Sequence, residues 1–113
     1  MKTEYSVVYS QYAKEDLFSI YQYIAFDLVE PEVAEKQVNR IRNAVRKLSV
    51  FPLKHPAVEW EPWKSVGVRK LPVDNYVVYY HVNGVSKQIS VVRIFYGGQD
   101  ISRQFIDKDF LKK

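Results

Sequence analysis

Apolar residues in the first half of the chain recur at the spacing of an α-helix. Residues 5–9 are rich in Val and Tyr, which is typical of a strand, and Ser10 then stands where a helix N-cap is expected. The next apolar positions are three or four residues apart and predict a helix over roughly 11–28: Ala13, Leu17, Ile20, Tyr21, Ile24 and Leu28. Pro31 fits the first turn of a second helix. Its apolar positions are Ala34, Val38, Ile41, Val45 and Leu48. The two stripes, joined by a short turn, predict a helical hairpin.

The second half of the chain carries strand patterns instead. We expect strands over 66–73, 76–82 and 88–96, with a hairpin turn at Asn83-Gly84. Residues 100–112 predict a short C-terminal helix. The order β-α-α-β-β-β therefore predicts an α+β fold in which the helical hairpin packs on one face of an antiparallel sheet. The N-terminal strand joins this sheet, and its other face is expected to be open to solvent or to a partner.

The segment between the helices and the strands, residues 51–64, holds three prolines and two tryptophans without any period, which predicts a loop. Exposed tryptophan often marks an interface. Trp60 and Trp63 are therefore candidate binding residues, although a loop this rich in proline can also fold them onto the core.

Composition narrows the class of protein. A chain of 113 residues with 47% hydrophobic residues suits one domain, residues 1–113. There is no cysteine, which excludes disulfides and thiolate metal sites. No apolar run approaches the roughly 18 residues that a membrane span needs, and the N-terminus lacks a signal-peptide pattern, so we expect a cytoplasmic protein without a membrane partner. The net charge of +4 suits an acidic protein or a nucleic acid as partner.

Candidate chemistry is limited to the predicted sheet. The chain contains no HExxH, CxxC, phosphate-loop or GxSxG motif, so we expect no cofactor and no metal. Tyr79 and His81 share one face of the central strand, and Arg69 and Arg93 lie on its expected neighbours. Arginine, histidine and tyrosine on an open sheet face could bind a phosphodiester and transfer protons. The simpler interpretations are a solvated His81 and an Arg93 held in an ion pair or a partner contact. The basic residues of the second helix, Arg40 among them, predict a solvated face.

Four segments, taken in order, resemble the RelE/ParE superfamily of toxins from type II toxin–antitoxin modules. They are the opening YSVVYSQYAKEDLFSIYQYI, the FP after the second helix, VRKLPVDNYVVYYHV, and the closing VRIFYGGQDI. Together they cover about residues 4–101. The resemblance implies a helical hairpin on an antiparallel sheet, a cytoplasmic location, and a cognate antitoxin whose acidic or amphipathic segment wraps the toxin. It implies one of two targets: DNA gyrase, or the ribosome with its mRNA.

Members of the RelE-like branch cleave mRNA and resemble one another at a few positions. This chain has different residues at most of those positions. Members of that branch carry arginine where Val77 and Gln99 stand here. Near the end of the last strand, Tyr96 can exchange a proton. A reduced catalytic set would therefore comprise Arg69, Arg93 and Tyr96.

The ParE-like branch acts through a binding surface and needs no such set. It resembles this chain in length and in the start of the second helix, Pro31 to Ala34. Its members usually carry arginine before the closing aspartate, whereas Gln99-Asp100 stands here. We expect a ParE-like toxin that binds gyrase, with Gln99 and Asp100 among its binding residues. The alternatives are an mRNA endonuclease and an inactive homologue that only binds an antitoxin.

Overall fold

The structure is a computed structural model that describes residues 4–59, 61 and 63–97, so the helix predicted over 100–112 lies outside the described residues. The elements are β1 (Ser6–Tyr9), α1 (Gln11–Gln22), the π-helical segment η1 (Tyr23–Asp27), α2 (Pro31–Lys47), α3 (Trp63–Val66), β2 (Val68–Val73), β3 (Tyr76–Asn83) and β4 (Gln88–Tyr96). Within the described residues, no helix combines the length and the apolar character that crossing a membrane would require.

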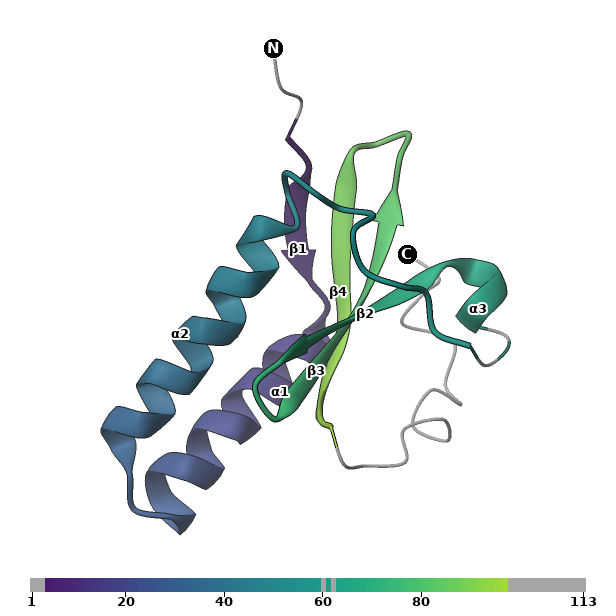
Figure 1. The fold of residues 1–113 in the computed structure, drawn as a ribbon. Helices are drawn as coiled ribbons and strands as arrows, with labels where there is room; N and C mark the ends of the chain where they lie inside the picture. The colour runs from purple at the N-terminus through teal and green to yellow at the C-terminus, as the bar shows by residue number, and fades with distance from the viewer. Residues whose placement is uncertain (1–3, 60, 62, 98–113) are drawn as a thin grey trace.

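The four strands form one sheet in the order β1-β4-β3-β2 (Figure 1). The predicted meander is confirmed, because β2 pairs antiparallel with β3 and β3 with β4. The N-terminal strand joins the sheet as expected, but it runs parallel to β4, with Ser6 opposite Gln88 and Tyr9 opposite Val91. The sheet is therefore antiparallel except for this edge strand.

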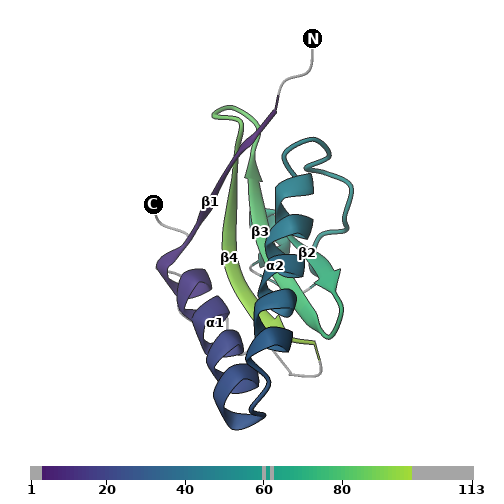
Figure 2. The same ribbon diagram turned by 90° about the vertical axis from the view of Figure 1, so that its left-hand side faces the viewer.

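The helical hairpin α1–α2 covers one face of the sheet, which confirms the predicted α+β architecture (Figure 2). The main core lies between the two layers. Tyr80 is fully buried in β3, and Leu17 of α1 and Ile41 of α2 pack in the same cluster. Ser10 begins α1 as predicted, since its Oγ accepts a hydrogen bond of 3.0 Å from the backbone N–H of Ala13.

The opposite face of the sheet is partly covered, contrary to the open face that we expected. A second core cluster there joins the loop and α3 to the strands: Val58, Trp63, Val68, Tyr79, Val92 and Phe95. The loop is fixed because it pairs with the outer edge of β2: the Val58 N–H donates to the Val68 carbonyl at 2.8 Å, and the Lys70 N–H to the Pro56 carbonyl at 3.1 Å. This pairing depends on contacts that a segment without any period does not reveal.

The turn between the helices contains a π-helical segment that changes which side chains face the core. The Leu28 N–H donates to the Tyr23 carbonyl at 3.0 Å, five residues back. The wider turn buries Ala25 and turns Leu28 outward, so the expectation that Leu28 continues the apolar stripe is wrong. Val29 follows with φ of 55°, the left-handed region that a β-branched residue seldom adopts.

This geometry predicts that Val29→Gly stabilises the fold. Glycine relieves left-handed strain of roughly 1–2 kcal/mol and loses part of that gain through the greater entropy of the unfolded chain. Little burial is lost, because the Val29 side chain is exposed. We expect the free energy of unfolding in urea to rise by about 0.5–1 kcal/mol. A fall in this free energy would contradict the strain argument.

Candidate functional site

The structure does not bring the predicted catalytic residues together. Arg69 pairs with Tyr80 and Arg93 with Tyr79, and these two tyrosines are consecutive in β3, so the two arginine side chains leave the sheet on opposite faces. Tyr96 pairs with Tyr76 at the far end of β3. The strand rise and spacing place the backbones of Arg69 and Tyr96 on the order of 15 Å apart. No common substrate atom can lie within hydrogen-bond distance of all three.

Arg93 is held in a two-pronged ion pair with Asp16 of α1. Its Nε donates to Asp16 Oδ2 at 2.8 Å and its Nη2 to Oδ1 at 3.0 Å, and the two side chains are only 18% and 15% exposed. The guanidinium carbon also lies 4.4 Å from the centre of the Phe95 ring. The charge of Arg93 is therefore balanced inside the protein, which agrees with its interpretation as an ion pair.

Arg69 braces the Pro-rich loop. Its Nη1 donates to the His55 carbonyl at 2.6 Å, and the Tyr80 hydroxyl donates to the Pro52 carbonyl at 3.2 Å nearby. Burial raises the pKa of Tyr80, and the adjacent Arg69 charge opposes that rise. These contacts hold residues 52–55 against the sheet and give Arg69 a structural role.

Tyr96 is exposed and borders a shallow groove of about 470 Å³ between α1, the start of η1 and the end of the sheet. Its ring packs edge-on against Tyr76 with the ring centres 6.0 Å apart. Burial is also the main cause that raises the pKa of Tyr76. Among the described residues that line this groove, Asp16 is the charged one and no Lys, Arg or His takes part. RNA binding depends on cations close to phosphate, and the described lining supplies none.

The structure describes three of the six predicted binding residues: Trp63, Tyr79 and His81. Tyr79 and Trp63 are 5% and 2% exposed and belong to the second core cluster, so the structure places both in the core of this chain and not on an exposed surface. The loop folds Trp63 inward, because the apolar face of the sheet offers its ring more buried area than solvent does. His81 is partly exposed on β3. Trp60, Gln99 and Asp100 lie outside the described residues.

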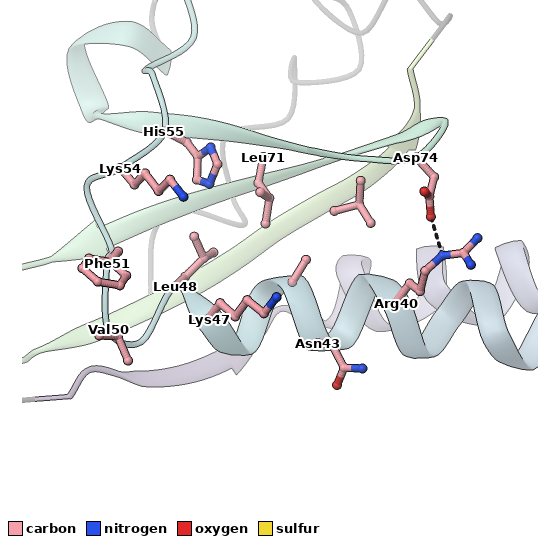
Figure 3. Close-up of a pocket in the computed structure, with 12 residues that line it drawn as sticks. Arg40, Asn43, Lys47, Leu48, Val50, Phe51, Lys54, His55, Leu71 and Asp74 are labelled. Carbon is pink, nitrogen blue, oxygen red and sulfur yellow. Dashed lines mark hydrogen bonds and ion pairs between the residues drawn. The ribbon is translucent and has the colours of Figure 1, made fainter.

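A second, larger hollow was not predicted from the sequence. It measures about 610 Å³ and lies between the C-terminal half of α2, residues 50–55 and β2 (Figure 3). We call it the basic groove. The apolar side chains that line it include Leu48, Leu71 and Val73, and its basic residues are Arg40, Lys47, Lys54 and His55. The described residues contain no group of three or more His, Cys, Asp or Glu that could hold a metal.

One carboxylate lies at the end of the basic groove. Asp74 accepts a hydrogen bond of 2.8 Å from Arg40 Nε and one of 3.0 Å from Gln37 Nε2. The hydrogen bond from Arg40, followed by that from Gln37, lowers the pKa of Asp74. The sequence predicted that Arg40 lies on a solvated face. The structure shows that this side chain is also engaged by Asp74. Lys47 and Lys54 add two further positive charges to the groove.

The sequence contained the charges of this groove but not their arrangement. Lys47 comes at the end of an amphipathic helix and Lys54 stands in a loop. Only the return of the loop toward β2, held by Arg69, brings them to one hollow.

Comparison with known proteins assigns the family. Residues 7–101 match the family model described as ParE toxin of type II toxin-antitoxin system, parDE. The chain belongs to this family. A solved structure of the chromosomal ParDE TA system from P. aeruginosa is 28% identical, with a TM-score of 0.68, and the match covers 84% of this chain and 98% of that one.

A second match shows the fold alone. The toxin–antitoxin complex RelBE2 from Mycobacterium tuberculosis is 17% identical, with a TM-score of 0.59, over 82% of this chain and 98% of that chain. Curated protein sequences gave no match. The predicted membership of the RelE/ParE superfamily is confirmed, and the chain is a ParE-type toxin of a type II toxin–antitoxin system.

The ion pair between α1 and β4 predicts a large effect of Asp16→Ala. The change leaves the Arg93 charge partly buried without its partner and removes the acceptor of the Ile94 N–H, which Asp16 Oδ2 accepts at 2.9 Å. We expect the free energy of unfolding in urea to fall by about 2–4 kcal/mol.

Glu15→Ala is the matched control on the exposed side of the same helix, and we expect a change within about 0.5 kcal/mol. Adding Arg93→Ala to Asp16→Ala should restore part of the loss, because the unpaired charge is then gone. Equal effects of Asp16→Ala and Glu15→Ala would contradict the role given to this ion pair.

Proposed function

We propose that this toxin acts by binding a protein target, with DNA gyrase as the expected target in the cytoplasm, and that a cognate antitoxin neutralises it. The observation that carries this proposal is the arrangement of the three candidate catalytic residues. Arg69 and Arg93 lie on opposite faces of the sheet and both are engaged within the protein, while the described lining of the groove beside Tyr96 offers no cation. General acid–base cleavage of RNA requires such groups around one phosphodiester.

The basic groove supports the antitoxin part of the proposal. Its apolar lining and basic residues suit an acidic amphipathic segment, whose apolar side chains would enter the hollow while its carboxylates meet Lys47 and Lys54. The P. aeruginosa match belongs to a ParDE toxin–antitoxin system, and the M. tuberculosis match is itself a toxin–antitoxin complex. A short neighbouring gene that encodes an acidic protein is the expected source of this partner.

Tyr96→Phe separates binding from catalysis, because it removes only the hydroxyl and keeps the ring that packs on Tyr76. We expect induced wild-type and Tyr96→Phe proteins to arrest bacterial growth equally, with DNA damage and uncut mRNA. Purified gyrase should lose supercoiling activity in the presence of either protein.

New mRNA 5′ ends inside translated codons, abolished by Tyr96→Phe, would instead make the chain an mRNA endonuclease. Harmless expression with intact gyrase activity would make it a homologue that only binds its antitoxin. Either result would overturn the gyrase proposal.

The basic groove predicts a charge-dependent complex. The double variant Lys47→Glu/Lys54→Glu should weaken binding of the protein encoded by the neighbouring gene by roughly tenfold or more, measured by titration calorimetry. Lys14→Glu, on the exposed surface of α1, is the control and should change the affinity less than about threefold. Unchanged affinity of the double variant would remove the antitoxin from this groove.

A further inference from the structure

The turn of the helical hairpin forms an exposed apolar surface that none of the roles above uses. We call it the hairpin tip and define it as residues 26–33. Phe26, Val29 and Val33 are 69%, 75% and 49% exposed, and Leu28 is half-exposed beside them. Single exposed apolar residues are ordinary in folded proteins, but four large ones within eight positions form a patch of the kind that marks an interaction site. The tip projects beyond the end of the sheet (Figure 2).

The backbone of the hairpin tip departs from regular helix and turn geometry. The π-helical segment turns Leu28 away from the core, and Val29 is held at φ of 55°. Backbone strain of this kind persists where the surrounding structure enforces it, and it is found more often at functional sites. The π-helical segment exposes Leu28, which a regular helix would bury, and the left-handed turn exposes a valine where glycine is more usual.

The charge of the tip differs from that of the rest of the protein. Residues 26–33 carry three carboxylates, Asp27, Glu30 and Glu32, and Glu35 follows in the next turn of α2. No Lys or Arg stands between residues 26 and 35, whereas the rest of the chain holds 17 Lys and Arg and the remaining nine carboxylates. All four carboxylates are exposed. They would repel the phosphates of RNA or DNA, and they would also repel an acidic segment of the type that suits the basic groove.

We propose that the hairpin tip is the surface with which this toxin contacts its protein target, and that the target offers an apolar hollow bordered by Lys and Arg. The proposal rests on the proposed function, in which toxicity comes from protein binding. The tip adjoins the N-terminal end of α2 and the basic groove its C-terminal half: Arg40, the groove residue nearest the tip, follows Val33 by about 10 Å along the helix axis, and Lys47 follows it by about 21 Å. The two surfaces can therefore be changed independently.

Val29→Gly is the sharpest test, because it removes an exposed side chain of the tip while it is expected to stabilise the fold. A loss of activity in this variant cannot come from unfolding, which urea denaturation of the same sample verifies. Phe26→Ser removes the largest exposed side chain of the patch. Val85→Gly is the matched control, since Val85 is 97% exposed in the turn between β3 and β4. Purified DNA gyrase is the probe, with supercoiling and direct binding as readouts and growth arrest on induced expression as the parallel measurement.

We expect Val29→Gly and Phe26→Ser each to weaken inhibition of gyrase by about tenfold and to relieve growth arrest, and Val85→Gly to act within about twofold of wild type. Asp27→Lys should weaken binding at low salt, and the difference from wild type should shrink as salt is added. Full gyrase inhibition by both tip variants would overturn the inference and leave the proposed function standing. So would a loss of antitoxin binding in the tip variants with toxicity intact, because the tip would then belong to the antitoxin.

The remaining outcomes separate the two proposals. If wild-type protein arrests growth without affecting gyrase, and the tip variants do not arrest growth, the tip stands as the target surface and gyrase fails as the target. Self-association of the wild type in sedimentation experiments that is lost in Phe26→Ser, with toxicity intact, would assign the tip to a second copy and overturn the inference. If wild-type protein neither arrests growth nor inhibits gyrase, both proposals are overturned.

Discussion

The open edge of β4 determines how the helical hairpin docks on the sheet. β4 has nine residues, but β1 pairs only with the segment from Gln88 to Val91, so the strand continues beyond its neighbour. Backbone polar groups there need partners because they lie beside the core. Helix α1 supplies them: Ser10 Oγ donates to the Val92 carbonyl at 2.8 Å, and Asp16 accepts the Ile94 N–H. The same contacts dock the helical hairpin on the sheet.

This docking also engages Arg93, a cation that an RNA-cleaving site would need. Asp16 satisfies the edge and balances Arg93 with the same carboxylate, so the arginine serves the joint between helix and sheet. Arg69 is committed in a comparable way to the carbonyl of the Pro-rich loop. Cations remain available at the basic groove, on the side of the molecule where the loop returns beside α2. The exposed charges of the basic groove are therefore available for binding, whereas Arg69 and Arg93 stabilise the fold.

Helix α2 separates two surfaces of opposite character. Its N-terminal end adjoins the acidic, apolar hairpin tip, and its C-terminal end lines the basic groove. The arrangement also suits the helix itself, because Glu32 lies in its first turn and Arg46 and Lys47 in its last, each complementing the helix dipole. A basic-groove partner and a tip partner would carry opposite charges.

The sequence predicted the two long helices and the four strands in their order, because apolar periods of 3.6 and 2 report which residues must leave water. It predicted neither α3 nor the π-helical segment η1. It placed the helical hairpin, the meander and the N-cap at Ser10, and the resemblance of four ordered segments led to the right family. Tertiary structure alone decided the rest. The parallel direction of β1, the burial of Trp63 and Tyr79, and the two opposite faces that hold Arg69 and Arg93 all depend on pairings between distant segments. Local patterns do not encode such pairings, since each is chosen by the packing of the whole core.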